Sequence, residues 1–172
     1  MAYAVIRTDL MSGTKQPADL VSLRFYDASG KKAEVENGVI VKLQGYEDGE
    51  REVMKAVAAS AGDDLNDCAI VAAPEVMYDE RKKNLDEFIN EAGKATRGYI
   101  PRSRNVFSVT KEGFVGGTVP TKGAEVGIGT GGKIDAAGKG LGACVGVEVV
   151  GRYTYYVIKI GKTEGASATV GG

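Results

Sequence analysis

The side chains that enzymes most often use for catalysis are missing or scattered in this sequence. None of the 172 residues is histidine, which removes Ser-His-Asp and Cys-His catalysis, His-ligated zinc and a near-neutral imidazole base. Carboxylate chemistry stays open, but Asp79, Glu80, Asp86 and Glu87 are interspersed with three basic residues. That mixture is typical of a solvated helix face rather than an acid–base pair. We expect a protein that is not an enzyme and that binds no cofactor and no metal.

A glycine-rich segment could in principle cradle a phosphate. Residues 127–132 read GIGTGG, but a phosphate loop needs a strand before it and a helix after it. The following segment, residues 133–138, is too short and too glycine-bounded to form that helix. We therefore interpret the segment as the tip of a β-turn.

Three arginines near two aromatic residues form the most basic part of the chain. Arg97, Arg102 and Arg104 surround Tyr99 and precede Phe107, and such a mixture can hold nucleic acid by charge and stacking. The net charge is −1 and the pI about 5.6, whereas a non-specific nucleic-acid binder needs a cationic surplus. A solvated loop is favoured; contact with an acidic protein surface and contact with nucleic acid are the alternatives.

The two cysteines, Cys68 and Cys144, lie far apart, each within an apolar strand-like run. Free cysteine behaves as a small hydrophobic side chain, so we favour two buried, reduced thiols over a disulfide. A metal site made of cysteines alone would need four ligands.

The clearest structural signal is a β-hairpin over residues 142–160, GACVGVEVVGRYTYYVIKI. Gly151-Arg152 suits a two-residue type II′ turn. Pairing Val150 with Tyr153 then divides the hairpin into one apolar face and one mixed face, and a slip of one residue would destroy this division.

The same count predicts which side chains face the core. Val147 and Tyr156 should be buried together, and Glu148 and Lys159 should be more exposed. Val147→Asp should then cost more than about 2 kcal/mol, because it would place an unpaired charge in the core.

The rest of the chain predicts further short strands and one helix. A helix over residues 79–92 would be capped by Asp79, ended by Gly93, and would bury Leu85 and Phe88 at helical spacing. The expected fold is mainly β: a small antiparallel β-barrel or sandwich of about eight short strands, with one short helix and an extended N-terminal segment. Strands are expected within residues 3–8, 21–26, 37–43, 51–57, 67–73, 105–110 and 124–128.

The N-terminal segment has two interpretations. Residues 3–8 and 21–26 could form the first hairpin of the domain, or they could belong to an extended arm that docks on a neighbouring subunit. We favour an arm for the functional hypothesis, so that a protein lacking residues 2–26 should stay folded. The expected organisation is an N-terminal strand or arm (1–30), a β-barrel domain (31–160) and a flexible tail (161–172). We find no secretory signal and no apolar run long enough to cross a membrane.

Four segments together resemble a known class of protein: residues 2–9 (AYAVIRTD), 48–53 (DGEREV), 77–85 (MYDERKKNL) and 148–156 (EVVGRYTYY). The chain resembles small structural proteins encoded beside the major capsid protein in tailed phages and prophages of Gram-positive bacteria. Its later half also looks like phage head-decoration (cement) barrels. The resemblance gives no catalytic residues to carry over.

The resemblance implies a non-enzymatic structural virion protein that binds and stabilises the phage capsid. Its partners would be the major capsid protein and possibly neighbouring copies of itself, on the surface of the phage head, with the host cytoplasm as its location during assembly. No membrane and no nucleic acid would be involved. A small β-barrel binding module for nucleic acid or a small ligand is the alternative. The candidate capsid-interface residues are Tyr3, Ile6, Arg7, Phe25, Tyr26, Arg97, Arg102, Arg104, Tyr153 and Tyr155.

Overall fold

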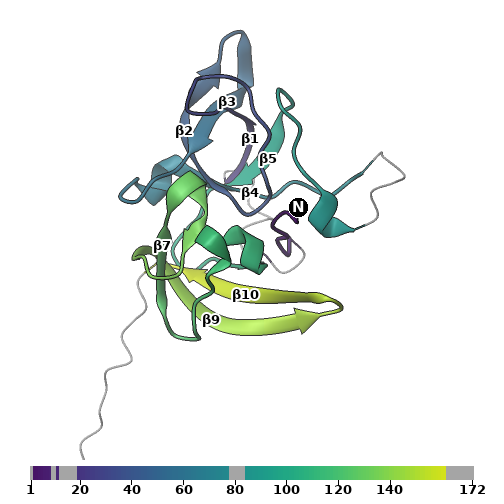
Figure 1. Ribbon diagram of the computed structural model, residues 1–172. Helices are drawn as coiled ribbons and strands as arrows, with labels where there is room; N and C mark the ends of the chain where they lie inside the picture. The colour runs from purple at the N-terminus through teal and green to yellow at the C-terminus, as the bar shows by residue number, and fades with distance from the viewer. Residues whose placement is uncertain (1, 9–10, 12–18, 78–83, 162–172) are drawn as a thin grey trace, which may run out of the picture.

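The computed structural model describes residues 2–8, 11, 19–77 and 84–161, and these form a mainly β protein (Figure 1). The strands are β1 (Leu20–Phe25), β2 (Ile40–Glu47), β3 (Glu50–Ala58), β4 (Cys68–Val71), β5 (Thr96–Tyr99), β6 (Val106–Val109), β7 (Glu125–Ile128), β8 (Ile134–Asp135), β9 (Gly140–Val150) and β10 (Tyr153–Ile160). The described helices are single 3₁₀ turns: η2 (Leu65–Asp67), η3 (Leu85–Glu87), η4 (Lys111–Gly113), η5 (Val115–Gly117) and η6 (Thr130–Gly132).

The first five strands close into a barrel in the order β1-β3-β2-β4-β5. Strands β1 and β3 run parallel, with Ser22 opposite Val53 and Phe25 opposite Ala56, and the other pairs in the barrel are antiparallel. The expected barrel is therefore present, but it is not antiparallel throughout.

The last five strands form a second sheet in the order β6-β10-β9-β7-β8. This sheet lies below the barrel in Figure 1. The molecule is thus a closed barrel joined to a separate sheet, and the single barrel or sandwich of the sequence prediction is only part of it.

Strands β2 and β4 belong to two hydrophobic cores at once. Val41 on β2, with Ala69 and Val71 on β4, packs inside the barrel around Leu23. The alternate residues of the same strands point the other way, into the core shared with the second sheet. That shared core contains Ile40, Cys68, Ile70, Phe107, Phe114, Val126, Ile134, Leu141 and Ile158, among others. Because β4 is buried on both faces, its sequence is an unbroken apolar run rather than an alternating one.

The two cysteines lie in this interior. Both thiols are free and buried, as the sequence predicted. Burial raises the pKa of the Cys68 thiol to about 11 and also raises the pKa of Cys144.

A glycine in η6 marks how closely the two sheets approach. Gly132 has φ +73°, and a Cβ atom there would lie 2.1 Å from the carbonyl oxygen of Ile40 on β2. Its neighbour Gly131 has a similar φ of +70° but open space around it. Only Gly132 therefore needs the absence of a side chain for packing as well as for its backbone conformation.

These two glycines give a matched pair of variants. Gly131→Ala should lower the free energy of unfolding by about 1–2 kcal/mol, the cost of a left-handed alanine. Gly132→Ala should lose roughly 1–3 kcal/mol more, because the methyl group would push β2 away from the second sheet. Denaturant unfolding of both variants measures the difference; equal losses would show that this contact does not join the two halves.

The N-terminal segment is part of the interior, so the docking-arm interpretation is wrong for the described residues. Val5 and Ile6 are almost fully buried. Thr110 N–H donates to Val5 O at 3.0 Å, and Arg7 N–H donates to Ser108 O at 2.9 Å. The alternative first hairpin is not formed either: Ile6 pairs with Val109 beside β6, whereas β1 pairs with β3 and β5. β1 thus lies in the same barrel as β2 to β5, so residues 1–30 are not a unit separate from the barrel. Of the expected tail over residues 161–172, only Gly161 lies within the described residues.

The expected result of truncation is therefore reversed. Deleting residues 2–26 removes β1 from the closed barrel and Ile6 from the second core, so the truncated protein should not fold. Circular dichroism and thermal melting measure this. A cooperative transition close to that of the full chain would restore the arm interpretation.

The helix expected over residues 79–92 is wrong for residues 84–92, and residues 79–83 lie outside the described part. A single turn, η3, is followed by extended backbone at Phe88 (φ −78°, ψ 135°). Asn90 then bonds Val35 through its N–H and its C=O, both at 3.1 Å. Its buried amide bonds Val35 O at 2.9 Å and accepts from Thr96 Oγ1 at 2.5 Å. These tertiary bonds outweigh a helix whose first turn would carry three positive charges.

The β9–β10 hairpin has the predicted register at its tip. Val150 pairs with Tyr153, and the count continues to Gly146 opposite Val157. Gly151 has φ +59°, and Arg152 is not among the described residues with positive φ, so the turn is type II′. A bulge then shifts the register, and Ile158 pairs with Cys144.

The predicted burial is wrong for Val147, whereas Tyr156 packs against the core as expected. Val147 pairs with Tyr156 but is 50% exposed, and Tyr155 on the other face is buried instead. Glu148 and Lys159 are exposed, as expected. On β9, β7 pairs only with Gly140–Ala143, so Val147 lies past the last residue with which β7 pairs, in the lower part of the molecule in Figure 1. Because Val147 is exposed, the expected loss of stability on Val147→Asp no longer applies.

Candidate interaction surface

The far half of β9 carries the largest group of exposed apolar side chains in the described residues. Val145 is 38% exposed, Val147 50%, Val149 73% and Val150 44%, and they make up four of the nine exposed large apolar side chains. We call Val145, Val147 and Val149, which project from one face of the hairpin, the valine strip. A contiguous apolar surface of this kind is typical of a site that another molecule covers.

The opposite face of the hairpin is covered by the protein's own residues. The Arg7 guanidinium lies 5.8 Å from the ring centre of Tyr155 and 3.4 Å from a Glu148 carboxylate oxygen. Arg152 lies over the Tyr153 ring at 4.9 Å. Asp86 Oδ1 accepts from the Tyr153 hydroxyl at 3.0 Å and from Arg152.

Four candidate interface residues meet on this covered face. Arg7, Tyr153 and Tyr155 are joined by the contacts above, and Tyr3 N–H donates to Asp86 O at 3.0 Å. Tyr155 is buried, and so is Ile6 nearby in the chain, so neither is available to a partner. Four of the ten residues that the sequence suggested for an interface thus lie together on the covered face of this hairpin.

The three arginines do not form one patch with the hairpin face. Arg97 is exposed on β5 of the barrel. Arg102 Nε donates to the buried carboxylate of Asp19 at 2.8 Å. Arg104 has φ +75°, and its N–H donates to Ile160 O at 2.9 Å. Arg102 therefore has a structural partner within the protein.

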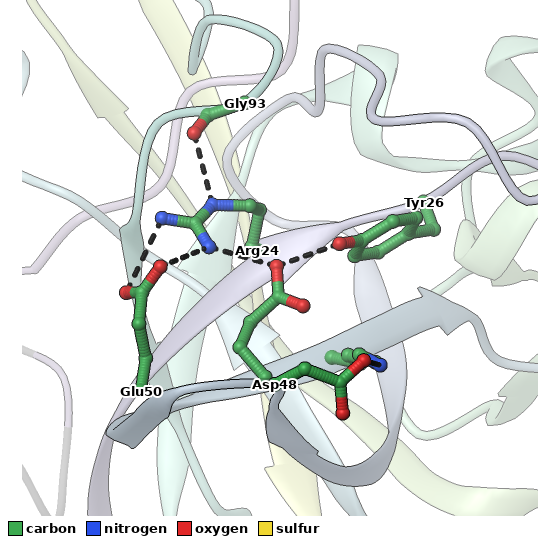
Figure 2. Close-up of polar contacts among 7 residues, drawn as sticks. Arg24, Tyr26, Asp48, Glu50 and Gly93 are labelled. Carbon is green, nitrogen blue, oxygen red and sulfur yellow. Dashed lines mark hydrogen bonds and ion pairs between the residues drawn. The ribbon is translucent and has the colours of Figure 1, made fainter.

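Phe25 and Tyr26 belong to the barrel, where Tyr26 joins a charged network (Figure 2). Arg24 is held by Glu47 at 2.7 Å, by Glu50 at 2.9 Å and by the Gly93 carbonyl at 2.9 Å. The Tyr26 hydroxyl donates to the same Glu47 oxygen at 2.6 Å. Phe25 is half-buried against the barrel core. We interpret this network as a clamp that ties β1 to β2 and β3.

The clamp shifts the pKa values of its members. The hydrogen bond from Tyr26, followed by that from Arg24, lowers the pKa of Glu47 below its ordinary value of 4.5. The bond to Glu47, together with burial, raises the pKa of Tyr26 above 10.0. The Glu47 contribution to stability is therefore present above pH 4.5 and is lost as the pH falls through the lowered value. The Tyr26 contribution is present below pH 10 and is lost as the pH rises through the raised value.

Two glutamates of the clamp give a matched comparison. Glu47→Gln should lower the midpoint of thermal unfolding at pH 7 more than Glu50→Gln, because the Glu47 side chain is 6% exposed and that of Glu50 47%. The deficit of Glu47→Gln against wild type should shrink as the pH falls below 4.5. Melting curves from pH 3 to pH 7 test both statements, and a constant deficit would show that Glu47 does not titrate within the clamp.

None of the described His, Cys, Asp and Glu residues form a group of three that could hold a metal ion, and every buried polar side-chain atom described has a hydrogen-bond partner. A half-open cleft of about 490 Å³ is lined by residues that include Glu34, Phe88, Asn90 and Thr96, but Asn90 and Thr96 are bonded to each other. Within the described ranges, no helix has the length and apolar character needed to span a bilayer.

Comparison with known proteins adds no relative. The chain matches no protein-family model, no curated protein and no solved structure.

Proposed function

We propose that this is a non-enzymatic structural protein of a phage head, which binds the outside of the assembled capsid and stabilises it. Two things support the proposal. One is the resemblance of residues 2–9, 48–53, 77–85 and 148–156 to capsid-associated proteins. The other, which carries the proposal, is the exposed valine strip on β9 of the terminal hairpin.

The valine strip has the properties that such a contact needs. Its side chains are apolar and β-branched, so they lose little conformational freedom when a partner covers them. The hairpin behind them is held by Arg7, Asp86 and the tyrosines of the covered face, so the strip is presented in a fixed shape. A standard interface of about 1,600 Å² would support firm binding, and many copies on one shell would together oppose the pressure of packaged DNA.

The partner in this proposal is the major capsid protein, and the place of action is the surface of the phage head, with the host cytoplasm as the site of assembly. No membrane and no nucleic acid take part. The barrel acts as a rigid support for the hairpin.

A single exposed substitution tests the contact surface. Val147→Asp should leave the free energy of unfolding within about 0.5 kcal/mol of wild type, because Val147 is half exposed. It should weaken binding to heads at least tenfold, because a carboxylate would have to leave water on docking. Co-sedimentation with empty heads of the phage or prophage that encodes the protein measures the binding.

Val119→Asp is the matched control. Val119 is an exposed valine outside the hairpin, 37% exposed, and the same change there should leave binding to heads unchanged. Failure of the wild-type protein to co-sediment would refute the capsid role. Equal binding by wild type and Val147→Asp would show that the valine strip is not the surface that contacts the head.

A further inference from the structure

Among the residues that the structure describes, none pairs with the outer edge of β9 over its far half. On that edge β7 pairs with the near half, from Gly140 to Ala143. Cys144 is the next residue with bonded groups: its N–H donates to Ala124 O at 2.9 Å, and its C=O accepts from Gly123 N–H at 2.7 Å. Beyond Val145, none of the described strands pairs with this edge.

The turn geometry shows which backbone groups point outward along this edge. In a two-residue hairpin the residues that flank the turn, Val150 and Tyr153, form a hydrogen-bonded pair. Such pairs alternate along an antiparallel ladder, so Glu148 and Gly146 also bond to β10. The N–H and C=O groups of Val147 and Val149 therefore point away from the hairpin, toward the open edge.

Apart from the bulge between Cys144 and Gly146, the edge lacks the features that normally prevent strands from joining. Proteins protect open edges with lysine, proline or inward-pointing charge. Residues 145–150, VGVEVV, contain no lysine and no proline. Their one charged side chain, Glu148, is paired with Arg7 on the covered face.

We infer that a second copy of this chain pairs with the open edge, antiparallel and about a two-fold axis at Val149. Two-fold pairing is self-complementary, because the same strand supplies the donors and acceptors on both sides. The inference goes beyond the proposed capsid role and does not depend on it.

Space and charge select the position of the axis. An axis at Val147 would push the turn of the second copy onto Gly123 and Ala124, which already occupy the edge beside Cys144. An axis at Glu148 would set two carboxylates directly opposite each other, which is destabilising. An axis at Val149 keeps both turns clear and places Glu148 opposite Val150 of the second copy. It also brings together the most exposed valines of the strip, Val149 of each copy.

The extended part of the pairing is short, from Glu148 to Val150 on each side, because β9 ends at Val150, so the buried area falls below the roughly 1,200 Å² of firm interfaces. The dimer should therefore depend on concentration. The two copies would join through backbone hydrogen bonds between their β9 edges. Their β9 and β10 strands would then form one four-stranded sheet, with both valine strips on the same face.

The first test is the mass of the purified full-length chain in solution. Sedimentation velocity should show the average mass rising from monomer to dimer as the concentration is raised from about 10 μM to 1 mM. Val149→Pro should remain monomeric throughout, because proline removes an outward N–H but no bond within the hairpin. Its circular dichroism should match wild type. A monomeric wild type at 1 mM, or a dimeric Val149→Pro, would overturn the inference.

The second test locates the axis by cross-linking. Cα atoms of a hydrogen-bonded antiparallel pair lie about 5.5 Å apart, within the range of a disulfide. Val149→Cys should therefore form a disulfide-linked dimer on mild oxidation. The native thiols should not interfere, since both are buried.

Thr154→Cys is the matched control for cross-linking. Thr154 is exposed and pairs directly with Val149, but the two copies of Thr154 would be about three strand spacings apart, roughly 14 Å. It should give no dimer above background. Equal cross-linking at both positions would indicate random collision and refute the two-fold axis. Neither test uses phage heads, so failure here leaves the capsid proposal intact, and failure to bind heads leaves the dimer intact.

Discussion

The burial of β2 and β4 between two cores is the constraint on which the rest of the structure depends. Val41, Ala69 and Val71 fill the barrel, while Ile40, Cys68 and Ile70 on the same strands fill the space below it. Each of these strands must therefore satisfy two packing environments at once, and neither core is complete without them. The close approach of Gly132 to Ile40 follows from this sharing, and so does the position of the hairpin relative to the barrel.

This constraint explains how one rigid body can present an exposed apolar strip. The N-terminal residues Val5 and Ile6 fill the second core, and Arg7 just after them holds the covered face of the hairpin at Glu148 and Tyr155. On the other face Tyr156 packs against Phe114, and the valine strip beside it on β9 stays exposed. The charged clamp around Arg24 fixes the opposite end of the molecule by tying β1 to its neighbours.

The sequence was sufficient for local features and insufficient for those set by distant contacts. Strand periodicity located most of the strands, and Gly151-Arg152 identified the type II′ turn and its register. Periodicity also predicted a helix over 79–92, but bonds from Asn90 to Val35 and Thr96 prevent one over residues 84–92. The exposure of Val147 could not be predicted, because it depends on where β7 stops along β9. The sequence does show that residues 145–150 are rich in valine. These valines indicate an exposed surface only once it is known that β7 pairs with β9 no further than Ala143.

The parallel pairing of β1 with β3 has a consequence for how the chain reaches its fold. β1 needs both β3 and β5 as neighbours, so the barrel cannot close before residue 99 has been made. Ile6 pairs with Val109, which itself pairs with Tyr156 on β10, so Ile6 cannot complete its contacts before residue 156 has been made. Long sequence separation between contacting strands slows folding, and open strand edges are exposed to other chains meanwhile. A nascent chain should thus remain vulnerable until residue 156 has been made, and its yield in cells should depend on chaperones.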